Sequence, residues 1–261
     1  MLAAAWRYRH FIWASIVRDV RARFAGSKLG LVWSILHPLA QAAIYTLILA
    51  EVLGARVPGI DDRTAYPVYL MAGLAAWGLF SEILTRSVSI FLDYSNALKK
   101  IAFPRISLPL IVCGGAIFNH VLLLLAVGGL FVLLGHPLTI AWAIIPVGII
   151  LISAFAIGLG LILGTLNVFE RDVAQLVGVV LQLWFWLTPI AYFLESVPAQ
   201  FLPLMQANPM TPLVQLYQGA MLYGRFPTNA EFAIASAIAT LVLIVALFVF
   251  RRASADLVDA L

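Results

Sequence analysis

The stretch from Ile106 to Phe169 contains no Asp, Glu, Lys or Arg. A helix needs about 20 mostly apolar residues to cross a hydrocarbon core of roughly 30 Å, so this stretch is long enough for two crossings. Over the whole chain, 63% of the residues are hydrophobic and 11% are charged, whereas soluble domains have roughly 45–50% and 25%. A soluble fold has too little interior for so much apolar surface. We therefore predict an all-α polytopic membrane protein.

Hydropathy predicts six transmembrane helices within one transmembrane domain, 1–261. The expected spans are residues 29–53, 66–92, 106–134, 138–168, 173–194 and 232–250. Residues 196–228 are also apolar, but their five prolines would interrupt a continuous spanning helix. We interpret this segment as re-entrant, gate-like helices on the external side, with a plain external loop as the alternative.

The basic residues predict the orientation. With six spans both termini lie on one side, and that side carries twelve Lys and Arg residues against three on the other. Cytoplasmic loops carry such an excess, so both termini are expected in the cytoplasm.

Several kinds of chemistry are absent from the sequence. The lysines are Lys28, Lys99 and Lys100, and none follows a glycine, so the chain carries no Walker A motif. The histidines and the single cysteine, Cys113, form no metal-ligand pattern. We expect the chain to bind no cofactor and no metal, and to have no catalytic residues. Any ATP-driven role requires another polypeptide.

Residues 5–25 form an expected amphipathic interface helix. One third of its helical wheel is apolar and aromatic, and three arginines share a flank: Trp6, Trp13, Ile16, Val17, Val20 and Phe24, with Arg7, Arg18 and Arg21. Such a helix lies in the membrane interface. Whether it also contacts a soluble partner, or serves only as an anchor, is left open by the pattern.

Residues 93–104 form a polar cytoplasmic loop that could hold a short helix ending before Pro104. Its candidate contact residues are Tyr94, Asn96, Leu98, Lys99, Lys100, Phe103 and Arg105. A short helix between two spans could pass a partner's motion into the membrane, and a solvated turn is the alternative. Within the preceding span, Glu82 and Arg86 are spaced i, i+4 and are expected to form an intramembrane ion pair.

Polar and aromatic residues recur at helical spacing in two spans. The first span has Trp33, His37, Gln41 and Tyr45, and the fifth has Gln182, Trp184 and Trp186. Aromatic faces contact sugar rings and amides hydrogen-bond loosely, which suits a polymer that slides through a channel. Helix packing and an interfacial aromatic belt are the alternative explanations.

Several ordered segments resemble one family, the membrane subunit of ABC-type polysaccharide and polyol-phosphate exporters. They are Arg18-Asp19 to Arg23-Phe24, Ser27 to Trp33, His37-Pro38, Leu98 to Arg105, Asn208 to Pro212, and the tail Asp256 to Asp259. The sequence from Tyr66 to Pro109 is most similar to O-antigen exporter permeases.

The resemblance implies a homodimer in the bacterial inner membrane, docked on two ATPase subunits that bind ATP and Mg²⁺. It also implies that the N-terminal helix and the loop transmit nucleotide-driven motion, that Leu29-Gly30 lies at the cytoplasmic mouth, and that aromatic rings line the channel. The expected function is export of lipid-linked polysaccharide from cytoplasm to periplasm. Capsular polysaccharide and teichoic acid are alternative cargos; a secondary carrier or stand-alone channel, and a membrane transferase, are alternative functions.

Overall fold

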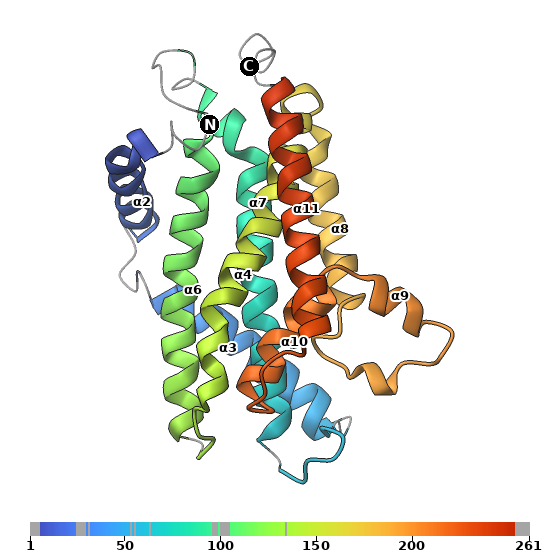
Figure 1. Ribbon diagram of the computed structural model, residues 1–261. Helices are drawn as coiled ribbons and strands as arrows, with labels where there is room; N and C mark the ends of the chain where they lie inside the picture. The colour runs from blue at the N-terminus through green and yellow to red at the C-terminus, as the bar shows by residue number, and fades with distance from the viewer. Residues whose placement is uncertain are drawn as a thin grey trace.

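The computed structural model describes residues 6–24, 30, 32–52, 54, 56–62, 64–95, 99, 105–133 and 135–253. Every regular element in these residues is a helix (Figure 1). The elements are α2 (Arg9–Phe24), α3 (Val32–Tyr45), the π-helix η1 (Thr46–Val52), α4 (Ala65–Asp93), α6 (Ser107–Leu133), the 3₁₀-helix η2 (Ile140–Ile144), α7 (Ile145–Phe169), α8 (Asp172–Trp186), the 3₁₀-helix η3 (Leu194–Ser196), α9 (Leu202–Ala207), α10 (Met210–Met221) and α11 (Asn229–Ala253).

Four helical stretches in the described residues are long and apolar enough to cross a membrane. They are Ala65–Asp93, Ser107–Leu133, Ile140–Phe169 and Asn229–Ala253. The first and fifth expected spans correspond to shorter apolar helices, Ile35–Leu49 and Asp172–Trp186. The prediction of an all-α chain with several apolar helices is therefore confirmed, and the count of long helices is four.

Helix α4 lies at the centre of the molecule. It packs against α3, α6, α7, α8 and α10, and most of its side chains are buried. Helix α11 packs mainly against α7 at the edge of the bundle, and α3 crosses the bundle obliquely (Figure 1). Glu82 and Arg86 belong to this central helix, and only 29% and 26% of their side chains are exposed.

Glycines of α7 allow its neighbours to approach closely. A Cβ atom at Gly164 would lie 2.6 Å from the carbonyl oxygen of Ser87 in α4, and one at Gly158 would lie 3.1 Å from the backbone nitrogen of Leu243 in α11. Helices in membranes associate through such small-residue contacts because lipid offers no hydrophobic driving force between them. The glycines of α7 therefore set the spacing of the bundle.

One end of the bundle is basic. Helices α4, α7 and α11 end there, and α6 and α8 begin there, at the top of Figure 1. Its described basic residues are Lys99, Arg105, Arg171, Arg251 and Arg252. We call this the basic end. At the opposite end the described basic residues are Arg56 and Arg225.

Helix α2 packs beside α6 near the basic end (Figure 1). Ser15 on its inner face is buried, and a Cβ atom at Gly114 of α6 would overlap the Ile16 side chain. Trp6 and Trp13 are 73% and 68% exposed. The helix therefore contacts the bundle through Ser15 and Ile16, and the tryptophan rings of this segment remain exposed on the surface.

Candidate functional site

A cavity of about 610 Å³ lies between α3, α4, α6 and α8. We call it the central cavity. Its wall is formed by His37, Pro38, Gln41, Tyr45, Leu74, Trp77, Gly78, Leu79, Ser81, Glu82, Asn119, His120, Leu123, Leu181, Gln182, Phe185 and Trp186. Among these described residues, Glu82 is the only Asp, Glu, Lys or Arg. The wall is therefore mostly aromatic, amide and imidazole.

The two stripes expected from the sequence meet at this cavity. His37, Gln41 and Tyr45 come from α3, and Gln182 and Trp186 come from α8. Positions four residues apart share one face of a helix, so each stripe presents its side chains together. The Gln41 amide donates to the Tyr45 hydroxyl at 3.5 Å, and the Tyr45 ring lies 6.2 Å from that of Phe185.

Two residues of the stripes lie away from the cavity wall. Trp33 is half-exposed in the first turn of α3. Trp184 faces the core, where its ring contacts those of Phe80 and Phe155 and its indole N–H donates to Asn208 Oδ1 at 2.8 Å. Trp184 and Trp186 thus have different surroundings although only Phe185 lies between them in the sequence.

The cavity also has walls that the sequence reasoning missed, on α4 and α6. Trp77, Ser81 and Glu82 share one face of α4, and Asn119 and His120 come from α6. The signal for the α6 pair was present, because Asn119-His120 is a polar pair inside the long uncharged stretch. Polar residues within a span face the protein interior or a water-filled cavity.

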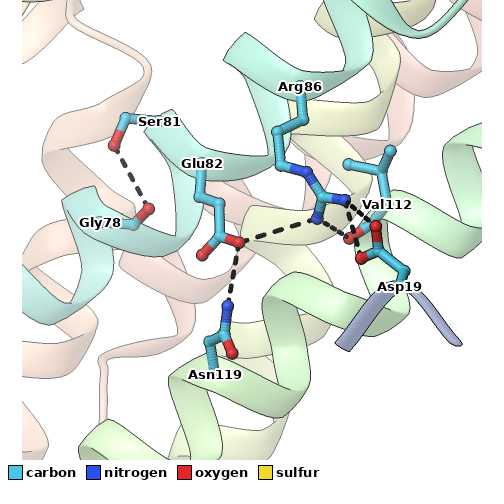
Figure 2. Close-up of polar contacts among 7 residues, drawn as sticks. All are labelled: Asp19, Gly78, Ser81, Glu82, Arg86, Val112 and Asn119. Carbon is cyan, nitrogen blue, oxygen red and sulfur yellow. Dashed lines mark hydrogen bonds and ion pairs between the residues drawn. The ribbon is translucent and has the colours of Figure 1, made fainter. Parts of the chain in front are cut away.

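A chain of polar contacts connects α2 with the cavity wall (Figure 2). Both Asp19 carboxylate oxygens accept hydrogen bonds from Arg86 Nη2, at 2.9 and 2.8 Å. Arg86 Nη1 lies 3.7 Å from Glu82 Oε1, which accepts a hydrogen bond from Asn119 Nδ2 at 3.2 Å. The same Nη1 donates to the carbonyl oxygen of Val112 at 3.3 Å.

Arg86 therefore lies between two carboxylates. The expected contact with Glu82 is the longer of the two, and the shorter one joins Arg86 to Asp19, 67 residues away in the sequence. Both partners of the shorter pair are largely buried, with 26% and 17% of the side chain exposed for Arg86 and Asp19. Charge-assisted bonds of this length fix geometry well, so α2 is held to α4 at a defined place.

Of the expected coupling residues, Tyr94, Lys99 and Arg105 are described, and they lie at the basic end. Tyr94 and Lys99 are exposed, and Arg105 is half-buried. Asn96, Leu98, Lys100 and Phe103 lie outside the described residues, as does Leu29 of the expected cytoplasmic mouth. Gly30 has a φ of +42°, a left-handed conformation that glycine adopts without strain.

The chain is not helical at residues 187–193, after α8 ends. Carbonyl oxygens of this segment accept hydrogen bonds from side chains of α4 and α10. The Tyr66 hydroxyl donates to Ala191 at 2.8 Å, the Tyr69 hydroxyl donates to Tyr192 at 2.9 Å, and Gln218 Nε2 donates to Pro189 at 3.0 Å. Non-helical backbone is tolerated at membrane depth where protein satisfies it.

Asn208 joins the end of α8 to the segment expected to form a gate. Its side-chain oxygen accepts from the indole of Trp184 and from the backbone N–H of Met210, and its amide donates to Leu187 O and Thr188 Oγ1 at 2.9 Å each. Helix α10 follows, and most of its side chains are buried. The 196–228 segment is thus partly folded into the bundle.

Metal ligands are not clustered in the part of the chain that the structure describes. No three His, Cys, Asp or Glu side chains gather there, and Cys113 is a buried free thiol. The central cavity offers aromatic surfaces, amides and one carboxylate. Those groups suit non-covalent contact with a polar organic ligand.

Comparisons with known proteins find related sequences over most of the chain. Residues 10–222 match the family model described as ABC-2 type transporter. The chain is 30% identical to the O-antigen export system permease protein RfbA of Myxococcus xanthus over 241 residues, which are 92% of this chain and 90% of the relative. It is 30% identical to RfbA of Klebsiella pneumoniae over 213 residues, 79% of this chain and 78% of the relative. It is 26% identical to the polysialic acid transport protein KpsM of Escherichia coli over 219 residues, 81% of each chain.

Proposed function

Since the chain belongs to the ABC-2 type transporter family, we propose that it forms the membrane channel of an ATP-driven exporter of lipid-linked polysaccharide. The chain is a multi-pass protein of the bacterial inner membrane. The proposed cargo moves from cytoplasm to periplasm, as an O-antigen would. The relatives named for O-antigen export support this choice of cargo.

The observation that carries the proposal is the composition of the central cavity wall. Aromatic rings of Tyr45, Trp77 and Trp186 can stack on the apolar faces of sugar rings, and the amides of Gln41 and Gln182 can hydrogen-bond to hydroxyl groups. Contacts of this kind are individually weak. A polymer held by weak and repeated contacts can advance without a deep energy minimum at any one position.

In the proposed topology α3 with η1, and α8 with the segment after it, complete six spans. The basic end faces the cytoplasm because cytoplasmic loops carry the excess of Lys and Arg. Both termini are then cytoplasmic, and the 196–228 segment lies toward the periplasm.

A second copy is proposed to close the channel along α3 and α8. Most large exposed residues of these helices are apolar, as on α11, but Gln175, Gln182 and His37 are exposed among them. Exposed residues of α11 are mostly apolar, among them Leu241, Ile244 and Phe248. Polar groups at membrane depth face protein or water rather than lipid. The α3 and α8 side therefore suits a homodimer interface, and the outer side of α11 suits lipid.

Energy for transport is proposed to come from two copies of a separate ATPase subunit, which bind ATP and Mg²⁺. The sequence offers no lysine after a glycine with which to hold phosphate. Motion of the ATPase would enter at the basic end, through α2 and the 93–104 loop. Asp19 and Arg86 then connect α2 to α4 and the cavity wall.

A neutral glycan fits the central cavity better than a polyanion does. The described wall has no Lys or Arg to pair with phosphate or carboxylate groups on a cargo, and its one charged residue, Glu82, is itself a carboxylate. The relative named for polysialic acid transport makes capsular polysaccharide a second candidate cargo. Because polysialic acid and teichoic acid are anionic, we propose a neutral polysaccharide as the preferred cargo.

The experiment that tests the proposal is purification of the tagged chain from its native membrane with the associated proteins identified. We expect a P-loop ATPase in equal amount. Reconstituted with that ATPase, the complex should export glycan when ATP is present and continue after the proton gradient is collapsed. Transport that stops with the gradient, or reproducible absence of an ATPase, would contradict the proposal and favour a secondary carrier.

A further inference from the structure

A second cavity of about 320 Å³ lies at the end of the bundle opposite the basic end. We call it the exit cavity. Its wall is formed by the beginning of α4, residues 193–195, α10 and the segment that follows α10. It shares no lining residue with the central cavity. Its volume falls at the lower limit of the roughly 300–1,000 Å³ typical of small-molecule sites.

The floor of the exit cavity is held in place by hydrogen bonds and packing. Tyr69 and Gln218 are buried there, and each donates to a carbonyl oxygen of the 187–193 segment, at 2.9 Å to Tyr192 and 3.0 Å to Pro189. The ring of Phe193 lies 4.6 Å from that of Tyr69. A floor of aromatic rings and fixed polar groups is thus formed without a ligand.

The rim of the cavity carries two charged side chains, Arg225 and Glu195, and only Arg225 has a partner of opposite charge among the described residues. Arg225 makes two hydrogen bonds to the carboxylate of Glu231, at 3.1 and 3.2 Å, so its charge is compensated. Glu195 is exposed and has no basic partner among the residues that the structure describes. A carboxylate with free oxygens repels anions and accepts hydrogen bonds from neighbouring hydroxyl groups.

Tyr223 completes the rim beside Glu195. Burial raises the pKa of the Tyr223 hydroxyl, Glu195 raises it further and Arg225 lowers it. A phenol is protonated at neutral pH, so this hydroxyl can donate. Gln215 adds an amide that can both donate and accept. The cavity therefore combines aromatic rings, amides, a phenol and an uncompensated carboxylate, and this set matches the alternating C–H faces and hydroxyl groups of a sugar.

We propose that the exit cavity binds a neutral saccharide unit of the exported glycan, held by Glu195, Tyr223 and Gln215 against the floor of Tyr69 and Phe193. This inference rests on the proposed export function, because that function brings glycan to this end of the bundle. The Glu195 carboxylate, which has no basic partner among the described residues, disfavours phosphorylated and acidic sugars relative to neutral ones. The site lies within one protomer, so each copy of a dimer carries its own.

Pro58, which precedes α4, is an exposed residue of the same cavity wall. The test uses the full chain in lipid nanodiscs with a fluorophore attached through Pro58→Cys. Cys113 is buried and does not compete for the label. The probes are neutral tetrasaccharides of glucose, mannose, galactose and N-acetylglucosamine, with glucose 6-phosphate and inorganic phosphate for comparison. We expect a saturable fluorescence change with at least one neutral tetrasaccharide and none with phosphate.

The variant Glu195→Gln should weaken that binding roughly tenfold, because a charge-assisted hydrogen bond is exchanged for a neutral one. The matched control is Glu170→Gln, an exposed carboxylate at the basic end, which should leave binding unchanged. A label moved to Glu170→Cys should report no change. No response to any of the tetrasaccharides, equal binding by Glu195→Gln, or preferential binding of phosphate would overturn the inference.

The outcome is separable from that of the proposed function. The Pro58 label reports binding in the exit cavity without ATP, ATPase or transport. Absence of saccharide binding in a complex that still exports glycan with ATP rejects the exit site alone. Absence of an ATPase partner rejects the proposed function. Saccharide binding that the Pro58 label reports would then still show that the exit cavity binds a saccharide.

Discussion

At the scale of residues, two tryptophans of α8 have different roles: Trp186 lines the central cavity, and Trp184 packs in the core. Trp186 is 57% exposed and lies on the central cavity wall. Trp184 is enclosed by the rings of Trp77, Phe80 and Phe155 and hydrogen-bonds to Asn208. Substitution of the two residues should therefore affect different properties.

We expect Trp184→Ala to lower the free energy of unfolding by roughly 3 kcal/mol, because it opens space in the core and removes a hydrogen bond. Trp186→Ala should leave stability nearly unchanged and slow ATP-dependent glycan export. Thermal unfolding in nanodiscs and an export assay measure the two effects. Equal losses of stability in both variants would show that Trp186 is a packing residue.

The Asp19–Arg86 pair gives a second residue-scale prediction. Asp19→Asn should destabilise the protein by roughly 3 kcal/mol, because breaking a buried pair leaves Arg86 without its nearest carboxylate. Glu82→Gln should cost less, since that contact is 3.7 Å long. The exposed Glu170→Gln is the control, and thermal unfolding is the measurement.

A charge exchange tests the pairing itself. The double variant Asp19→Arg with Arg86→Asp should recover part of the stability lost by either single change. Protease cleavage within α2 should rise in the single variants and fall again in the double one. Simple addition of the two losses would rule out a direct interaction.

The sequence predicted the cavity stripes better than this ion pair, for a physical reason. His37, Gln41 and Tyr45 share a face through helical periodicity, which is local. Asp19 and Arg86 meet only because α2 packs beside α6, which itself packs against α4, and no periodicity encodes that contact. The i, i+4 spacing therefore predicts the contact of Arg86 with Glu82, the more distant of the two carboxylates, and not its contact with Asp19.

At the scale of elements, the end of α8 depends on side chains from other helices. Asn208 joins Trp184, Leu187, Thr188 and Met210 by hydrogen bonds. Asn208→Ala should destabilise the protein by about 2–4 kcal/mol, because it leaves buried donors and acceptors unpaired. Hydrogen exchange should then rise in residues 187–212 and stay unchanged in α6. The exposed Asn229→Ala is the control, and uniform exchange throughout would argue against a local role.

Close packing of α7 gives a second element-scale prediction. Gly164→Ala places a Cβ 2.6 Å from the carbonyl oxygen of Ser87, so α4 and α7 must separate. We expect a loss of about 1–3 kcal/mol in thermal unfolding. Gly129→Ala in α6, where a Cβ meets nothing within 4 Å, should be neutral or stabilising by up to about 1 kcal/mol. A neutral Gly164→Ala would show that this contact does not limit the helix spacing.

Hydropathy could not locate the end of α8. The apolar run continues to Leu194, so the fifth span was expected over 173–194, whereas the helix ends at Trp186. The chain stops being helical where Tyr66, Tyr69 and Gln218 replace the missing backbone hydrogen bonds. Tyr66 and Tyr69 lie 125 and 123 residues before their acceptors in the sequence. A local hydropathy pattern cannot predict contacts between residues so far apart.

At the scale of the whole molecule, the amide and imidazole side chains exposed on α3 and α8 predict where two copies meet. A cysteine at Leu183, an exposed residue of α8, should form a disulfide-linked dimer in native membranes under mild oxidation. Phe248→Cys on the outer side of α11 is the matched control, since it is similarly exposed but expected to face lipid. Cross-linking through Phe248 and not through Leu183 would place the interface on α11.

The different surroundings of α4 and α11 set how freely each helix can change during evolution. Nearly every direction around α4 is occupied by another helix, whereas most of the outer surface of α11 is uncovered. Substitutions in α4 must fit several neighbours at once, so its sequence should diverge slowly between related exporters. The outer positions of α11 need only remain apolar, so we expect the sequence of α11 to change faster than that of α4. Sequence similarity in α11 should therefore be less useful than similarity in α4 for recognising distant relatives.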